Sequence, residues 1–197
     1  GLRVPMTPYH DHSDERTRAA LVARMEREVV VLVSDAGTPL ISDPGYKLVR
    51  DARAAGRHVT TLPGPCAAIA AITLSGLPSD RFLFVGFLPN KAKARADAIA
   101  EFAGLRATLV FYESGPRRAA ALTALADGLG NREAAVAREI SKLYEECATG
   151  TLADLAARYA DAPPKGEIVI VVGPRGEESG EEADAATIDA ALRDAMA

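Results

Sequence analysis

Hydrophobic positions near the start of the chain change from helical to strand-like spacing. Residues 16–27 place Leu21, Val22 and Met25 on one helical face, and residues 29–33 follow as a continuous block of valine and leucine. An uninterrupted apolar block of this length is typical of a strand that is buried on both faces of a parallel sheet. The pattern therefore predicts a helix that leads directly into a buried strand.

The next segment returns to strand spacing after a short helix. Polar residues and a proline at 42–45 begin a helix over 46–55, Gly56 ends it, and residues 58–62 form a second short apolar block. A strand, a helix and a strand joined by short connections predict a βαβ unit, in which the two strands lie parallel in one sheet.

The rest of the chain is divided by stretches rich in glycine and proline. Residues 63–65 precede a helix of small residues over 66–75, and residues 76–80 are typical of a boundary between two lobes. Beyond that boundary the pattern predicts strands at 82–87, 108–112, 134–137 and 167–172, helices at 96–102, 116–125 and 151–159, and a basic loop at 89–95.

Together these elements predict a two-lobed α/β protein with mixed or parallel sheets flanked by helices. We expect an N-terminal lobe at 1–78, a C-terminal lobe at 79–174, and an acidic linker followed by a short helix at 175–197.

Composition excludes several other classes of protein. The 197 residues are 48% hydrophobic and 25% charged, as is usual for a folded soluble domain. No apolar run approaches the roughly 20 residues that cross a bilayer. Cys66 and Cys147 lie far apart and the histidines form no HExxH pair, so we expect no disulfide framework, no metal site and a cytoplasmic location.

Candidate chemistry begins where the first predicted strand ends. Ligands of open parallel sheets bind at the carboxyl ends of strands, and Asp35, Gly37 and Thr38 lie at such an end. The carboxylate accepts hydrogen bonds, the glycine permits close approach to the main chain, and the threonine offers a hydroxyl. A tight turn capped by Asp35 explains the same residues without any ligand.

Other small or charged residues follow the remaining predicted strands. Residues 63–68 combine a glycine with small side chains, Glu113 follows the strand at 108–112, and Arg138 and Glu139 follow the strand at 134–137. These positions fit a cleft, but close helix packing and ordinary polar strand ends explain them as well.

Basic residues concentrate between Lys91 and Lys142, although the formal net charge is −4. Such a cluster is either an ordinary solvated face or a surface that follows the phosphates of a nucleic acid. The residues concerned are Lys91, Lys93, Arg95, Arg117, Arg118, Arg132, Arg138 and Lys142. The chain has no Walker loop, no GxGxxG fingerprint in a strand–helix context and no GxSxG elbow.

A family resemblance narrows these alternatives. Residues 32–46 (LVSDAGTPLISDPGY) resemble the signature of the ribosomal RNA small subunit methyltransferase I family, the RNA-modifying branch of the tetrapyrrole methylases. Further matches, in the same order along the chain, are LPGPCAA at 62–68, GLPSDRF at 76–82, GFLP at 86–89, FYES at 111–114, AREISK at 137–142 and KGE at 165–167.

The resemblance implies two α/β lobes with S-adenosylmethionine bound between them, and a homodimer that acts on small-subunit ribosomal RNA or the 30S subunit. It implies methyl transfer to the 2′-hydroxyl of a cytidine ribose. The donor contacts it assigns are Asp35, Gly37, Thr38, Ile41, Cys66, Ala67, Tyr112, Glu113 and Arg138. The RNA contacts expected with it are Lys91, Lys93, Arg95, Arg117 and Arg118.

A ribose hydroxyl is a weak nucleophile, so a nearby base or electrostatic stabiliser should assist the transfer. We predict Glu113 in this catalytic role, with Glu139 and Lys165 as the other candidates. A structural ion pair in the cleft explains each of them equally well.

Two departures from the family pattern limit the prediction. The family begins with a strand and a Gly/Pro-rich loop before the residues present here, and it carries a longer C-terminal helical piece than residues 187–196 provide. We therefore expect an incomplete N-terminal lobe and a fragment. The competing functions are methylation of a tetrapyrrole ring on the same fold and a module that binds no donor.

Overall fold

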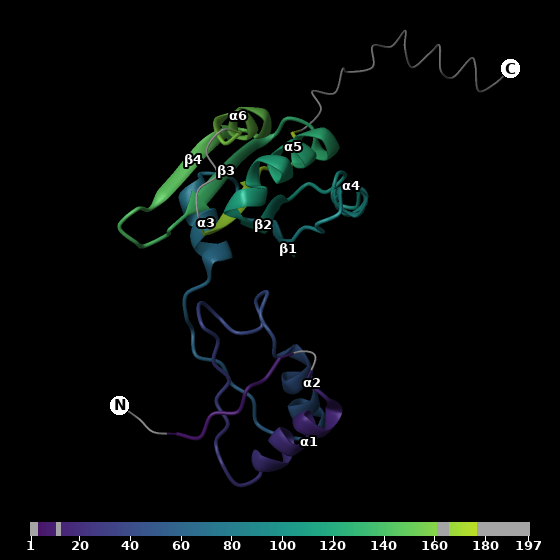
Figure 1. Ribbon diagram of the computed structural model, residues 1–197, viewed down its shortest axis with the longest axis vertical. Coiled ribbons are helices and arrows are strands. Elements are labelled where there is room, and N and C mark those ends of the chain that lie inside the picture. The colour runs from purple at the N-terminus through teal and green to yellow at the C-terminus, as the bar shows by residue number, and fades with distance from the viewer. Residues whose placement is uncertain (1–3, 11–12, 161–165, 177–197) are drawn as a thin grey trace, which may run out of the picture.

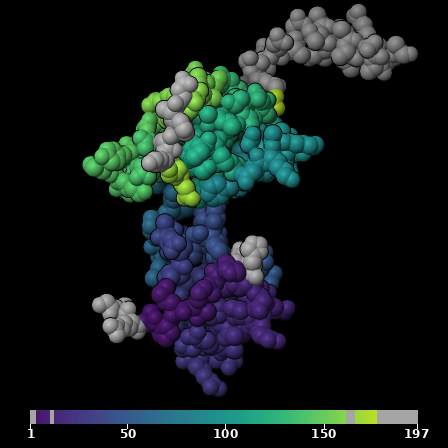
Figure 2. Space-filling model, viewed as in Figure 1, coloured from purple at the N-terminus to yellow at the C-terminus, as the bar shows by residue number. Residues whose placement is uncertain are grey.

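A computed structural model describes residues 4–10, 13–160 and 166–176 of the chain. Figure 1 shows two parts: an N-terminal section with two helices, and a larger section built around a β-sheet. In the space-filling view of Figure 2 a narrower blue region joins the two.

The larger section contains a five-stranded mixed sheet with the strand order β1-β2-β5-β3-β4. Its first pair, β1 and β2, is parallel, and all the other neighbouring pairs are antiparallel. The strands are β1 (Phe82–Phe87), β2 (Thr108–Ser114), β3 (Glu133–Arg138), β4 (Glu146–Thr151) and β5 (Glu167–Val172).

Helices cover both faces of this sheet (Figure 1). Helix α3 (Ala67–Ser75) packs Ala68, Ala71 and Ile72 on one face, against alternate residues of the central strands. The other face is covered by α4 (Ala92–Ala100), α5 (Arg118–Leu129), which follows the 3₁₀ turn Gly115–Arg117, and α6 (Leu152–Arg158). Because β5 is central and covered on both faces, its sequence is a nearly continuous run of valine and isoleucine.

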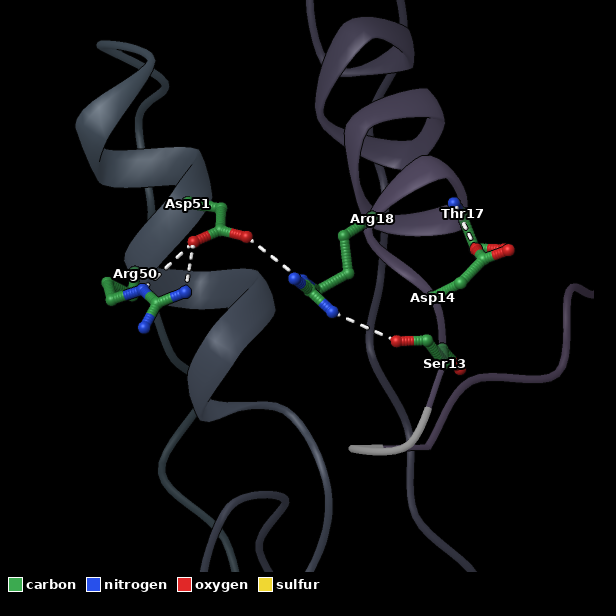
Figure 3. A network of polar contacts seen from close by, with 6 residues as sticks. All are labelled: Ser13, Asp14, Thr17, Arg18, Arg50 and Asp51. Atoms are coloured by element: carbon green, nitrogen blue, oxygen red, sulfur yellow. Dashed lines mark hydrogen bonds and ion pairs between the residues drawn. The ribbon is translucent and has the colours of Figure 1, made fainter.

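The N-terminal section holds α1 (Glu15–Arg24) and α2 (Tyr46–Ala54) side by side. Asp14 caps α1 by accepting a hydrogen bond from the backbone N–H of Thr17 at 2.7 Å. Arg18 then donates through Nε to Asp51 of α2 at 3.0 Å and through Nη1 to the Ser13 carbonyl at 2.9 Å (Figure 3). This partly buried guanidinium fixes the start of α1 against α2.

The predicted βαβ unit at the start of the chain is wrong. Residues 29–33 and 58–62 form neither a helix nor a strand. Val29, Val31 and Val33 are 90%, 69% and 65% exposed, whereas the prediction buried this block on both faces. The physical reason is the lack of a partner: within the described residues, no backbone hydrogen bond involves either segment, so no sheet ladder closes.

The helix and strand predictions for the larger section are confirmed except at three places. Strand β4 was not predicted; α4 begins at Ala92, inside the predicted basic loop, and the helix predicted at 116–125 extends to Leu129. Helix α3, which the sequence assigned to the N-terminal lobe, packs on the sheet of the second section. The helix expected at 187–196 lies outside the described residues, and the domain limits stay a prediction.

Candidate functional site

A cavity of about 760 Å³ lies where the N-terminal section meets the sheet. Its walls come from several separate stretches of the chain: residues 32–44, the beginning of α3, the ends of β1, β2 and β3, and the beginning of β5. Most of these segments are far apart in sequence, so the cavity depends on the tertiary fold.

The first wall is the loop that follows residues 29–33. Gly37 has a left-handed backbone with φ of 71°, and a Cβ there would lie 3.7 Å from the Pro65 carbonyl oxygen. Thr38 donates its hydroxyl to that same carbonyl at 2.9 Å. This bond joins the two loops that the sequence singled out separately, and it brings Asp35 and Ile41 to the cavity.

The second wall is built by Tyr112 of β2 and the first turn of α3. The Tyr112 hydroxyl accepts a hydrogen bond from the backbone N–H of Ala68 at 3.1 Å, which satisfies one of the open N–H groups at the helix start. The Tyr112 ring lies edge-on to Phe84 and Phe87 at 4.9 and 5.7 Å. Burial raises the pKa of Tyr112 to about 12, so its hydroxyl stays protonated at physiological pH.

The third wall is the end of β3 and the turn beyond it. Arg138 donates through Nε to Glu146 of β4 at 2.6 Å, and this pair is in register across the two strands. Glu139 has a φ of 48° and accepts from Lys142 Nζ at 3.1 Å. Its Oε1 lies 3.6 Å from the position that a Cβ atom on Gly166 would occupy. This carboxylate therefore lies beside the start of β5.

The charge of the lining is mixed. Four carboxylates, Asp35, Asp43, Glu139 and Glu167, face two cations, Arg138 and Lys142. Together with the rings of Phe87 and Tyr112, this excess of carboxylates suits a ligand that carries both apolar and cationic groups.

Comparisons with known proteins place the chain in a family. The sequence profile of the tetrapyrrole (corrin/porphyrin) methylases matches residues 2–156. A ribosomal RNA small subunit methyltransferase I from Erythrobacter litoralis is 55% identical over 196 residues, which is 100% of this chain and 69% of that protein. The chain belongs to this methyltransferase family within the tetrapyrrole methylases.

Two further relatives with the same name agree. The protein from Mesorhizobium japonicum is 48% identical over 93% of this chain and 64% of its own length, and the one from Escherichia coli O157:H7 is 43% identical over 94% and 66%. The chain thus spans about two thirds of the length of these relatives.

Several solved structures share the fold. Diphthine synthase matches with a TM-score of 0.61 at 16% identity, covering 81% of this chain and 65% of that one. The methyltransferase CobJ matches with 0.58 at 19% identity, covering 85% and 74%. A uroporphyrin-III C-methyltransferase from Thermus thermophilus, complexed with S-adenosylhomocysteine, matches with 0.52 at 20% identity, covering 80% and 72%.

Most of the donor contacts predicted for this methylase lie together in the structure. The cavity is lined by Asp35, Gly37, Thr38, Ile41, Cys66, Ala67, Tyr112 and Arg138, and also by the catalytic candidate Glu139. Lys165 lies outside the described residues.

Glu113 is absent from the cavity wall. Strand β2 turns Tyr112 toward the cavity, and the next side chain along a strand points to the opposite face. Glu113 is 1% exposed; its Oε2 lies 3.1 Å from Arg117 Nη2, and its Oε1 accepts from the Ser114 N–H at 2.7 Å. The structure therefore places Glu113 in a buried ion pair and gives it no access to the cavity.

The predicted RNA contacts fall into two groups. Lys91 and Lys93 are exposed at the start of α4, where Lys93 pairs with Asp97 at 2.7 Å, and Arg95 is half-buried on the same helix. Arg118 is 1% exposed, with its guanidinium 3.3 Å from the ring centre of Tyr159. Arg117 is held by Glu113 and the Leu88 carbonyl. The structure contradicts an RNA contact by Arg118, since its side chain is buried against Tyr159, just beyond α6.

Sequence reasoning missed several residues of the methylase cavity. Phe87, Asp43 and Glu167 line it as well. Each lies inside a stretch that matches the family, at 86–89, 32–46 and 165–167, so the motifs contained the signal although no role was assigned.

In the part of the chain that the structure describes, no helix is both long and apolar enough to cross a membrane. No group of three or more histidine, cysteine, aspartate or glutamate side chains is placed to hold a metal among these same residues.

Proposed function

We propose that this chain forms the donor and acceptor site of an S-adenosylmethionine-dependent methyltransferase that acts on the 2′-hydroxyl of a cytidine ribose in small-subunit ribosomal RNA. One observation carries the proposal. Eight residues assigned to the donor from separate motifs line one cavity, in a chain 55% identical to a protein named as a ribosomal RNA small subunit methyltransferase I.

The residues of the cavity fit the chemistry of the donor. S-Adenosylmethionine combines an adenine, a ribose, a sulfonium cation and an amino acid. The Asp35 carboxylate and Thr38 hydroxyl are suited to ribose and ammonium groups, and Phe87 and Tyr112 present rings to a cation. Gly37, Cys66 and Ala67 leave the backbone accessible, and 760 Å³ lies within the range of ligand pockets.

When bound, the donor supplies a methyl group that the sulfonium activates toward displacement. The residues of this chain align the acceptor oxygen with that methyl group, because an in-line displacement gains most of its acceleration from positioning. Transfer would replace the donor's S–CH₃ bond by an O–CH₃ bond, so a residue of this chain would have to accept the proton of the acceptor hydroxyl. The walls around Tyr112 and Arg138 hold the two partners in line.

We propose Glu139 as the group that receives this proton. It lines the cavity, whereas Glu113 is buried in its pair with Arg117. The Lys142 ammonium 3.1 Å from Glu139 fixes the carboxylate, and the left-handed backbone at Glu139 is typical of residues constrained at functional sites.

The remaining parts of the proposal concern the wider protein. The relatives' name supports ribosomal RNA or the 30S subunit as substrate, with Lys91, just before α4, and Lys93 and Arg95 of α4 as phosphate contacts. We further propose a homodimer in the cytoplasm. CobJ and the uroporphyrin-III C-methyltransferases from Thermus thermophilus are 19–22% identical to this chain, against 43–55% for the relatives named for ribosomal RNA, so the small-molecule alternative has less support than the RNA substrate.

The test combines donor binding with product mapping. The protein is incubated with labelled S-adenosylmethionine and small ribosomal subunits that lack the modification, and the label is located by nuclease digestion and mass spectrometry. We expect it on a cytidine ribose. Donor binding by calorimetry without label in RNA would refute the RNA substrate and favour the tetrapyrrole one, whereas failure to bind the donor would refute the proposed cavity.

A further inference from the structure

The turn between β3 and β4 presents two large apolar side chains to solvent beside the cavity. We call residues 139–145 the β3–β4 arm. Leu143 and Tyr144 are 87% and 71% exposed, while Glu139 and Lys142 of the same arm line the cavity. Among the described aromatic side chains, Tyr144 is the most exposed. In Figure 1 the arm projects from the sheet beyond the helices.

Several polar contacts hold the arm in one shape. At its tip the Ser141 N–H donates to Glu145 Oε2 at 2.5 Å, and the Lys142 N–H donates to the Glu139 carbonyl at 2.9 Å. Glu139 and Ser141 both have a left-handed backbone, with φ of 48° and 61°. Side chains that an ordered turn presents to solvent lose less entropy on binding than those of a loose loop.

The base of the arm is clamped by a second set of contacts. Arg138 and Glu146 close the last strand pair at 2.6 Å, and Glu146 also accepts from Arg158 Nη2 at 3.0 Å. The arm is therefore joined to α6 and to the sheet, so the exposure of Tyr144 is a property of the folded structure.

An RNA that places a ribose in the cavity must change the stacking of its bases. A 2′-hydroxyl is accessible in the minor groove of stacked RNA, but a ribose that enters a walled cavity is drawn away from its neighbours, and the bases beside it then lose a stacking partner. Aromatic side chains commonly replace that partner, in a manner that tolerates any base because every base has a flat face.

We propose that Tyr144 is a stacking platform for a nucleobase of the RNA, next to the nucleotide whose ribose enters the cavity. Lys142, two residues earlier, places a cation at the same mouth for the adjoining phosphate. This inference rests on the proposed function and adds to it a specific contact with unpaired RNA.

The test compares Tyr144→Ala, Tyr144→Phe and Leu143→Ala in the full chain. The probes are deproteinised small-subunit ribosomal RNA and intact small subunits, both lacking the modification. Because stacking needs the ring and not the hydroxyl, Y144A should raise Kd and KM for deproteinised RNA about tenfold, and Y144F should retain wild-type values. L143A should have a much smaller effect, and donor affinity by calorimetry should not change in any variant.

Four outcomes would overturn the proposal. Y144A could match the wild type on both probes, or Y144A could weaken binding to intact subunits alone, which would indicate a ribosomal protein as the partner. L143A and Y144A could be equally harmful and also change the sedimentation of the protein, which would indicate a second copy of the chain. If the wild type binds donor but labels no RNA, both this inference and the proposed function fail; if only the variants behave unexpectedly, the proposed function stands.

Discussion

The hydroxyl of Tyr112 accepts the backbone N–H of Ala68 at 3.1 Å, across 44 positions of sequence. This bond ties the first turn of α3 to the central part of the sheet, at the rim of the cavity. Since the residues just before Ala68 line the same cavity, the position of Tyr112 determines where the beginning of α3 lies.

Tyr112→Phe should test this bond. The variant keeps the ring and its contacts with Phe84 and Phe87, but leaves the Ala68 N–H without its acceptor, so we expect a loss of about 1 kcal/mol in the free energy of unfolding. We also expect weaker binding of S-adenosylmethionine. Urea unfolding and calorimetry measure the two effects. Unchanged donor affinity would show that the Tyr112 hydroxyl does not contribute to donor binding.

The pH dependence of the same residue has a definite sign. In the folded state the pKa of Tyr112 is about 12, raised by burial above its usual 10.0. Its contribution to stability is therefore fully present below pH 10.0 and is lost as the pH rises toward about 12, because the unfolded chain gives up this proton first. Unfolding measured across this interval should show a shallower decline for Y112F than for the wild type.

Arg118 should behave as a structural residue. Its guanidinium lies over the Tyr159 ring in a buried position, and burial lowers its pKa. Arg118→Ala should reduce the free energy of unfolding by about 2 kcal/mol or more, since it removes a desolvated cation–π contact and leaves a cavity. Below its melting temperature the variant should bind RNA with the same salt dependence as the wild type. A reduced salt dependence would show that Arg118 does contact the RNA.

Lys93 should behave in the opposite way. Its side chain is 88% exposed on α4, so Lys93→Ala should leave stability unchanged but weaken RNA binding and reduce the slope of log K against log salt by about one. The matched control is Arg106→Ala, an exposed cation before the start of β2, at the end of the strand away from the cavity. Equal effects of the two variants would show that α4 has no special part in binding.

Glu146 should link acid stability to the β3–β4 arm. The hydrogen bond from Arg138 holds the pKa of Glu146 below its usual 4.5. The stability it contributes is thus present above pH 4.5 and is lost as the pH falls through the lower folded value. Glu146→Gln should flatten this acid decline and weaken RNA binding by loosening the arm. A steeper acid decline in the variant, measured by urea unfolding at several pH values, would contradict the assignment.

The second half of the fold could be predicted because its sequence patterns are strong. The apolar runs at β2 and β5 are buried on both faces; β5 has the predicted bounds, and β2 extends two residues beyond the predicted strand at 108–112. Strand β4 was missed because its sequence, ECATGT, contains one buried apolar residue and a glycine, and it exists through its pairing with β3. Strand β4 can therefore be recognised from its pairing with β3 but not from its own residues.

The sequence predicted which loops form the candidate site, but not which strand side chains point into it. Motifs located the residues around Thr38, Cys66 and Arg138, which the structure brings to one cavity. Tyr112 and Glu113 are neighbours in sequence, so their side chains point to opposite faces of β2 and only one of them can reach the cavity. The sequence did not establish which face of this strand lies toward the cavity. The strand predicted at residues 29–33 was wrong for another reason. A strand-like pattern shows that a segment is able to pair, but a strand forms only where a second segment pairs with it.

The exposed apolar segment at residues 29–33 has a practical consequence for the behaviour of this chain in solution. It combines β-branched, uncharged side chains with backbone groups that pair with nothing in the described structure. Such a segment is a template for strands from other molecules and is among the sequence types that seed aggregation. Concentrated samples of the chain should self-associate through it, and a lysine in place of Val31 should improve solubility without altering the cavity.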